Sequence, residues 1–274
     1  MFGWPRWLPR PGIASSTGNS RRQEIAGWIP KSRFRFWHAP SIESALKTDL
    51  MGRTLATPRR LQDQRDPEKA MNSIGRIAIG IRLLRGKAVA IAICGDRATP
   101  AYVGRAELLL SDPKFPSTLR PFHAIARLRL EKALPMVQRD ETLVRKAALT
   151  SVSSFIERLR KSKMSPRHAA IVSDDEPAQI GNPHLKAHAE ERRLFREATA
   201  SAARDLGIDS IFLVETEISE SAFKIIGVTR PTIHLWLEDI AAVAGRPWRA
   251  VEKTSAVAAW IALASGQRSG VESQ

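Results

Sequence analysis

The sequence predicts an α/β fold in which a small mixed sheet is flanked by helices and preceded by a basic, largely irregular tail. Two apolar runs, KAVAIAICGD and AYVGRAELLLSD, have the composition of β-strands and are separated by a short connection that contains proline. Further along, the short apolar runs HAAIVSDD and DSIFLVE enclose one helical segment. Because strand, helix and strand joined by short segments form a parallel pair, we expect antiparallel and parallel neighbours in one sheet.

Residues 1–65 are expected to form a flexible basic tail, because they are rich in Pro, Arg, Ser and Trp and show no sustained period. Within this tail, WIPKSRFRFWHAP alternates Arg33 and Arg35 with aromatic residues, which suits a short strand or stacking on exposed bases. The aromatic side chains have an alternative role, which is to hold the tail against the core. An organelle transit peptide is a second alternative for the same segment.

A single α/β domain is expected over residues 66–265, followed by a disordered end over residues 266–274. The segment DPEKAMNSIGRIAIGIRLLRG predicts the first helix of the domain, since Asp66 can cap it and Pro67 suits its first position. Ile77, Ile81 and Leu84 recur in it with helical spacing. The next two runs predict an antiparallel hairpin, and its first strand should be buried on both faces because it is apolar throughout.

Two helices are expected after the hairpin. A short one runs from Pro121 to Pro135, and a longer one begins at a cap formed by Asp140 and covers DETLVRKAALTSVSSFIERLRKSK. The longer helix has an apolar stripe, and its basic residues project elsewhere. Together with Arg33 and Arg35, these basic residues are the predicted nucleic-acid contacts: Arg145, Lys146, Arg158, Lys161 and Lys163.

The helix between the later strands starts at NPHLKAHAEERRLF, where Asn182 can cap and Pro183 suits the first helical position, and it closes at Gly207. Three helical segments end the chain: SESAFKIIG, RPTIHLWLEDIAAVAG and RPWRAVEKTSAVAAWIALAS. In the last of them Pro247 is expected in the first turn. The two apolar runs around the helix and these closing helices complete the predicted layers.

The charge of the chain is strongly asymmetric. Lys and Arg outnumber Asp and Glu by 31 to 13 up to Met164, whereas from Ser165 onward the numbers are 12 and 15, for a formal net charge of +15. This distribution favours a polyanionic partner such as nucleic acid, with an anionic membrane surface or a merely solubilising charge as alternatives. GDRATPAYVG lacks the glycine spacing of a phosphate-binding loop, so nucleotide-dependent chemistry has no support.

The single cysteine, Cys94, excludes an internal disulfide, and its position in an apolar run predicts a buried thiol in a reducing compartment. No stretch approaches the roughly 20 apolar residues that span a bilayer. The prolines and arginines of MFGWPRWLPRPG do not fit the continuous apolar segment of a secretory signal. We therefore expect a cytoplasmic protein without integral membrane contact.

The order of these elements resembles the ribonuclease-H-like superfamily, and within it the RuvC type of nuclease. The segments that carry the resemblance are KAVAIAICGD and AYVGRAELLL as leading strands, HAAIVSDD and DSIFLVE as later strands, and EKTSAVAAWIALAS as the closing helix. The similarity spans residues 87–265 and rests on the order of elements. It implies hydrolysis of phosphodiesters by two divalent ions, Mg²⁺ or Mn²⁺, which acids of the first strand, a later strand and the last helix hold.

By position, the resemblance assigns Asp96, Asp174 and Glu252 as the catalytic and metal-binding acids. Asp96 departs from the family pattern, because it follows its strand whereas the family places its first acid within the strand. Each acid also has a structural alternative: Asp96 can brace a turn, Asp174 can end a strand, and Glu252 can lie in the first turn of a helix.

Glu191 is the fourth candidate acid, since it interrupts the apolar stripe of the helix that begins at Asn182. A buried carboxylate needs a partner, which could be His188, an arginine from elsewhere or a metal. His184, His188 and Glu191 share one helical face, so a zinc site built on His184 and His188 is one hypothesis. Pairing of Glu191 with His188 or an arginine is the structural alternative, and the remaining histidines are expected to be isolated.

Two classes of function remain open from the sequence. The first is a nucleic-acid-associated protein of ribonuclease-H-like build, either a metal-dependent nuclease or a relative that has lost its acids and only binds. The second is a non-catalytic interaction protein whose basic N-terminal part contacts RNA or a protein partner. Convergence of the candidate acids in the folded chain would favour the nuclease.

Overall fold

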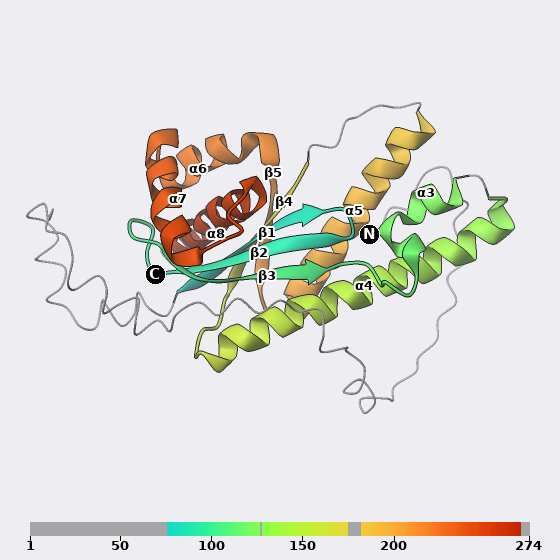
Figure 1. Cartoon of the computed structure of the whole chain (residues 1–274), viewed down its shortest axis with the longest axis horizontal. Helices are drawn as coiled ribbons and strands as arrows, with labels where there is room; N and C mark the ends of the chain where they lie inside the picture. The colour runs from blue at the N-terminus through green and yellow to red at the C-terminus, as the bar shows by residue number, and fades with distance from the viewer. Residues whose placement is uncertain (1–75, 127, 175–181, 270–274) are drawn as a thin grey trace, which may run out of the picture. The chain divides into compact units, whose positions relative to one another are not determined.

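The computed structural model describes residues 76–126, 128–174 and 182–269. The expected tail, with Arg33 and Arg35, lies outside the described residues. In the described part, a five-stranded mixed sheet lies between two layers of helices (Figure 1). The strands are β1 Ile77–Leu84, β2 Lys87–Cys94, β3 Ala101–Leu109, β4 His168–Ser173 and β5 Asp209–Val214.

The helices of the described part include two short 3₁₀ turns. They are η3 Pro116–Leu119, α3 Pro121–Ile125, α4 Leu130–Lys161, α5 Pro183–Asp205, η4 Glu215–Glu217, α6 Ile218–Ile226, α7 Arg230–Ala244 and α8 Ala250–Ser269. α8 therefore extends four residues past the expected domain end at residue 265.

The strand order of the sheet is β3-β2-β1-β4-β5. β1 pairs antiparallel with β2, which pairs antiparallel with β3, and on its other side β1 lies parallel to β4, which lies parallel to β5. The predicted mixed α/β fold, with an antiparallel hairpin and a strand-helix-strand unit, is confirmed. β2 is buried along nearly its whole length, as its apolar sequence predicts.

The helix predicted from Asp66 is wrong where the structure describes it, because Ile77–Leu84 forms the central strand of the sheet. Helices cover both faces of β1, so an uninterrupted apolar run fits a strand as well as it fits a helix. Gly80 belongs in this strand because α8 crosses it closely: a Cβ at Gly80 would lie 1.9 Å from the carbonyl oxygen of Ser255.

The two helices predicted between Pro121 and Lys163 have different boundaries in the structure. α3 is short, and α4 is one continuous helix of 32 residues that contains Pro135. Proline in the second turn removes one backbone hydrogen bond, and the exposed ring of Pro135 meets no packed neighbour, so the helix continues through it. Asp140 is buried inside α4 and accepts from the side chain of Arg139, so the prediction that it caps a helix is wrong.

The predicted helix after β4 and the three closing helices are confirmed. The side chain of Asn182 accepts a hydrogen bond from the His184 amide at the start of α5, and Gly207 after its end has a φ of 74°. The expectation for Pro247 is wrong, because it precedes the first residue of α8 by three positions.

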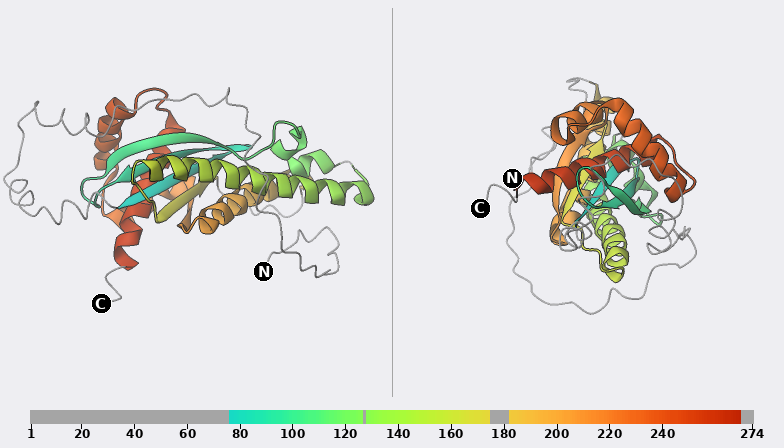
Figure 2. Two further views of the ribbon diagram at one scale, coloured as in Figure 1. Left: turned by 90° about the horizontal axis from the view of Figure 1, so that it is seen from below. Right: turned by 90° about the vertical axis from the view of Figure 1, so that its left-hand side faces the viewer.

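The two helical layers receive alternate side chains of the strands (Figure 2). Ile79 and Ile81 of β1 pack towards α4 and α5, whereas Ala78 of the same strand packs towards α8. Because side chains alternate along a strand, Arg82 belongs to the α8 face. Asp174 follows Val172 at the end of β4 and belongs to that face as well.

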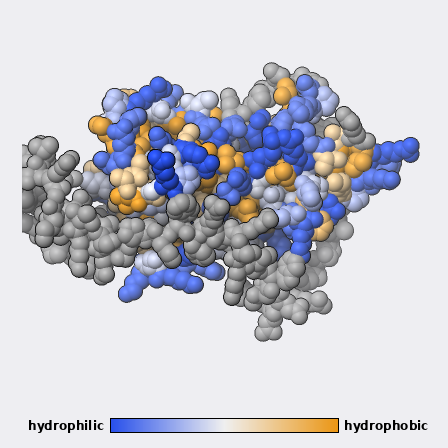
Figure 3. All heavy atoms as spheres, in the orientation of Figure 1, coloured by the Kyte–Doolittle hydropathy of each residue, from blue (hydrophilic) through white to orange (hydrophobic). Residues whose placement is uncertain are grey.

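The surface seen in Figure 3 is mostly hydrophilic, with hydrophobic patches that include one where Figure 1 places α6 and α7. Phe223 of α6 and Leu235 of α7 are 61% and 63% exposed. Within the described residues, no helix combines the length and the apolar character that crossing a lipid bilayer requires.

Candidate functional site

A buried arginine lies at the edge of the sheet where the parallel strands end. Arg82 is the one charged residue of β1 and is 6% exposed. Its guanidinium donates two hydrogen bonds to the carboxylate of Glu215, one of them from Nε over 2.9 Å, and it forms a salt bridge with Asp174. One cation therefore binds two acids that lie 92 and 133 residues away in the chain.

The parallel strands bring these three residues together. Asp174 directly follows β4 and Glu215 directly follows β5, while Arg82 is paired with Val172 near the end of β1. β1, β4 and β5 are parallel, so their carboxyl ends share one edge of the sheet, which is where open α/β sheets bind ligands.

The electrostatics of the group keep Arg82 charged. Burial by itself lowers the pKa of Arg82, but the hydrogen bond with Glu215 and the negative charge of Asp174 outweigh it and raise the pKa above its usual range. The two carboxylates satisfy the cation, and the cation keeps the carboxylates from repelling one another.

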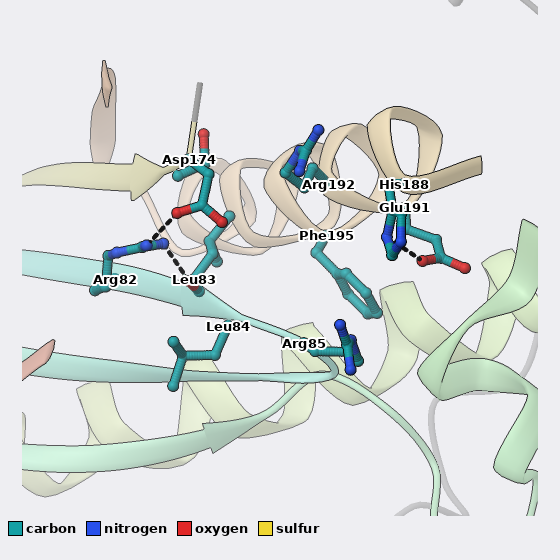
Figure 4. Close-up of a pocket in the computed structure, with 10 residues that line it drawn as sticks. Arg82, Leu83, Leu84, Arg85, Asp174, His188, Glu191, Arg192 and Phe195 are labelled. Carbon is teal, nitrogen blue, oxygen red and sulfur yellow. Dashed lines mark hydrogen bonds and ion pairs between the residues drawn. The ribbon is translucent and has the colours of Figure 1, made fainter. Parts of the chain in front are cut away.

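A pocket of about 190 Å³ opens beside Arg82 (Figure 4). Three arginines and two acids line it, and the imidazole of His188 stands at its rim with Glu191. The Nε of Arg192 is buried and has no hydrogen-bond partner among the described residues. The lining comes from the end of β1 and its turn, the end of β4 and one face of α5: Arg82, Leu83, Leu84, Arg85, Ser173, Asp174, His188, Glu191, Arg192 and Phe195.

Three histidines form a cluster that adjoins this pocket. His184 and His188 lie on successive turns at the start of α5, and His123 comes from α3. Nε2 of His123 lies 3.1 Å from Nδ1 of His184, and Nε2 of His184 lies 3.2 Å from Nε2 of His188. One ring nitrogen from each residue can be chosen so that all three lie within 4.8 Å of one another.

Glu191 holds this cluster from the inside. It is 4% exposed, and its Oε1 accepts from Nδ1 of His123 over 2.8 Å and from the backbone amide of His123 over 3.2 Å. Its Oε2 lies 3.8 Å from Nδ1 of His188. The expectation that His123 is isolated is wrong, and the buried carboxylate has two histidine neighbours in place of an arginine.

The imidazole of His188 favours its neutral form. Burial and the neighbouring His123 lower the pKa of His188, and the opposing charge of Glu191 does not compensate for them. A neutral imidazole offers a lone pair to a metal ion or to a hydrogen-bond donor.

The candidate acids do not all meet. Asp96 lies after β2, and Cys94 of β2 pairs with Ile77 at the beginning of β1, so Asp96 lies at the edge of the sheet opposite to Asp174. Its Oδ1 accepts from the amides of Ala98 and Thr99, which makes it a turn residue.

Glu252 lies on the α8 face of the sheet, and it has its own partner. Its carboxylate accepts from the backbone amide and the guanidinium of Arg249 at the start of α8. Ser255, one turn further along, donates to the carbonyl of Val89, which is paired with Arg82. α8 thus directs Glu252 towards the same part of the sheet, while its contacts remain within its own helix.

The first strand carries no acid in this fold. The resemblance to ribonuclease-H-like proteins implies an acid within the first strand, and the structure makes β1 that strand in place of β2. The charged residue of β1 is Arg82, so a cation occupies the strand from which the family supplies a metal ligand. Asp174 meets this cation, and Glu191 lines the same pocket from α5.

The predicted basic contacts on α4 lie apart from the pocket. Arg158, Lys161 and Lys163 are exposed at the end of α4, which leads to the beginning of β4, whereas the pocket lies where β4 ends. Lys146 is exposed near the middle of the helix, and Arg145 lies 4.0 Å from Glu197 of α5. These residues form a separate basic surface.

Sequence reasoning missed Arg82, Glu215 and His123. Arg82 did leave a signal, since it is the sole charge in the run IAIGIRLL, but the helical interpretation placed it on an exposed face. Nothing local marks Glu215 or His123, because each one meets its partner only through the sheet or through the packing of α3 against α5.

No known protein family matches the sequence, and no curated protein matches it. Among solved structures, the chain is similar to Thermus thermophilus RuvC, with 11% identity, 70% of this chain and 96% of that chain covered, and a TM-score of 0.43. T. thermophilus RuvC in complex with a Holliday junction substrate matches with the same identity and coverage and a TM-score of 0.41. A PilM-PilN type IV pilus biogenesis complex matches with 16% identity, 73% and 48% coverage, and a TM-score of 0.24. These similarities concern the fold alone.

Proposed function

We propose that the chain binds the phosphate backbone of nucleic acid at the pocket beside Arg82 and does not cleave it by a two-metal mechanism. The observation that carries this proposal is the replacement of a first-strand acid by Arg82, which binds Asp174 and Glu215. Of the two alternatives within the first function class, this observation favours the relative that only binds.

The donor set beside Arg82 does not fit a pair of divalent ions. Mg²⁺ and Mn²⁺ require carboxylates that are free to coordinate them. Here both carboxylates contact a guanidinium that stays charged, and that positive charge repels a cation at the same position. A two-metal centre would have to break these salt bridges and leave Arg82 buried without a partner, which is costly.

The remaining cations of the pocket fit a phosphate. Arg85 is exposed in the turn after β1, and Arg192 lines the pocket from α5 with a buried Nε that has no partner among the described residues. A guanidinium matches the geometry of a phosphate by donating two parallel hydrogen bonds. The formal net charge of +15 adds a sequence-independent attraction for any phosphate polymer.

A pair of double variants tests the pocket. Arg85→Ala with Arg192→Ala should weaken binding of a fluorescent single-stranded or duplex oligonucleotide by roughly tenfold or more and lower the salt slope by about 2. The control is Arg167→Ala with Arg204→Ala, which removes the same charge from exposed positions before β4 and at the end of α5. Equal loss in both proteins would mean that total charge drives binding, and the pocket assignment would be wrong.

A cleavage assay tests the other half of the proposal. The full chain is incubated with single-stranded, duplex and branched substrates, with and without Mg²⁺ or Mn²⁺. We expect no metal-dependent nicking above that of an Asp174→Ala protein purified in the same way. Nicking that needs Mn²⁺ or Mg²⁺ and is lost in Asp174→Ala would overturn the proposal and restore the nuclease.

A further inference from the structure

We propose that His123, His184 and His188 bind one first-row transition-metal ion, such as Zn²⁺, at the junction of α3 and α5. This inference does not depend on nucleic-acid binding, because it rests on the spacing of the three rings and on the position of Glu191. It extends the hypothesis of a zinc site on His184 and His188 by supplying a third ligand from another helix.

The spacing of the ring nitrogens fits a single ion. Zn²⁺ binds imidazole nitrogen at roughly 2.0–2.1 Å, so two nitrogens in a tetrahedral site lie about 3.3 Å apart. The observed separations of 3.1 Å between His123 and His184 and of 3.2 Å between His184 and His188 are close to that value. His184 is exposed, so its ring can turn to present one nitrogen to an ion shared with both neighbours.

Glu191 has the place of a positioning carboxylate. Metal-binding histidines commonly donate their second ring N–H to a carboxylate, which fixes the tautomer and the ring orientation. Nδ1 of His123 donates to Glu191, and Nδ1 of His188 lies 3.8 Å from the same carboxylate, so the Nε2 atoms of both rings remain available for the ion. The 4% exposure of Glu191 keeps this arrangement in place without bulk water.

The ligand type selects the class of metal. Three imidazoles suit Zn²⁺, Co²⁺ or Ni²⁺ and are poor ligands for Mg²⁺, which prefers oxygen. Three protein ligands leave the fourth tetrahedral position to water or to a small anion. Because His188 also lines the pocket, this position is accessible from solvent on that side.

The test is metal binding by the full chain after treatment with a chelator and without nucleic acid. Titration with Co²⁺ should give visible absorption bands of a tetrahedral site that saturate at one equivalent, and Zn²⁺ should displace the Co²⁺. His184→Gln with His188→Gln should abolish these bands. Glu191→Gln should weaken Zn²⁺ binding by about 10- to 100-fold, because the rings lose their positioning partner.

His234→Gln provides the matched control. His234 is exposed on α7 and lies 3.2 Å from Glu238, so it is also a histidine beside a carboxylate, but it has no part in the cluster. This variant should bind Co²⁺ as the parent does. Mg²⁺ should produce no displacement.

The inference fails if the parent shows no saturable Co²⁺ binding, or if the double variant, folded by circular dichroism, binds Co²⁺ as tightly as the parent. The outcome is separable from that of the phosphate pocket. Arg85→Ala with Arg192→Ala should keep the Co²⁺ bands, and failure of oligonucleotide binding would leave the metal titration unaffected.

Discussion

At the scale of single residues, the buried charges of this chain are the informative ones, and each has a partner that explains it. Arg82 is matched by two carboxylates, Glu191 by His123, and Glu252 by Arg249. Burying a charge without a partner is costly, so these pairs are requirements of the fold as well as candidates for function. Arg82 differs from the other two because it lies in a strand and binds acids at the ends of two further strands.

Glu252 provides a prediction at this scale. Burial raises its pKa, but the hydrogen bonds from the side chain and backbone of Arg249 outweigh that effect, so the pKa of Glu252 lies below its usual range. Its carboxylate therefore stabilises the fold above the unfolded pKa of about 4.3, and this contribution is lost as the pH falls through the lower folded pKa. Glu252→Gln should lower the free energy of unfolding by about 1 kcal/mol at neutral pH, with the difference shrinking in acid.

Chemical denaturation across the pH range measures this effect. Glu131→Gln is the control, because Glu131 is also an acid in the first turn of a helix but is exposed. A loss in Glu252→Gln that is the same at pH values of about 3 and about 7 would show that the charge of Glu252 does not stabilise α8.

At the scale of elements, the packing of α8 across β1 positions the site. α8 contacts the sheet through small side chains such as Ala256 and Ala259, which are fully buried, and Gly80 lets the helix backbone reach the strand. This close crossing sets the distance of α8 from the sheet and thereby the position of Glu252 relative to β1. The predicted hairpin, α5 and the closing helices followed from apolar periodicity and caps, whereas this crossing had no sequence signal beyond a glycine.

Gly80→Ala tests the crossing. The added Cβ would lie 1.9 Å from the carbonyl oxygen of Ser255 and 2.4 Å from the amide nitrogen of Ala259, so backbone must move. We expect a loss of about 2–3 kcal/mol in the free energy of unfolding. Gly104→Ala in β3 is the matched control, since a Cβ there meets nothing within 4 Å, and its stability should be unchanged or slightly higher. Equal stability of the two variants would contradict the close packing of α8.

At the scale of the whole molecule, the distribution of charge is the dominant property. The basic excess up to Met164 and the slightly acidic remainder were evident from the sequence, and in the described part the fold separates the basic positions into two surfaces. One is the pocket with Arg85 and Arg192, and the other is the end of α4 with Lys161 and Lys163. A phosphate polymer that contacts either surface must release counterions.

The full chain should therefore bind nucleic acid with a strong salt dependence. Raising the salt concentration from about 50 to about 200 mM should weaken binding by roughly 100-fold or more, with little difference between sequences of equal length. Fluorescence anisotropy over a salt series gives this slope. A complex that keeps its affinity across the series would favour the interaction protein with a protein partner.

The sequence by itself determined what depends on near neighbours. The hairpin, the strand-helix-strand unit, the cap at Asn182 and the closing helices follow from apolar period, from side chains that bond within one turn, and from short connections. The charge of the chain and the candidacy of His184, His188 and Glu191 were evident in the same way, because residues on one helical face are three or four positions apart.

Only the tertiary structure decided what depends on the order of strands and on the packing of helices. β1 became a strand because neighbours on both sides and helices on both faces accept its apolar run. Arg82 met Glu215 across 133 residues, and His123 met Glu191 across 68. Side chains so far apart in sequence carry no mutual pattern, so the arginine among the acids and the third histidine were decided by the folded chain.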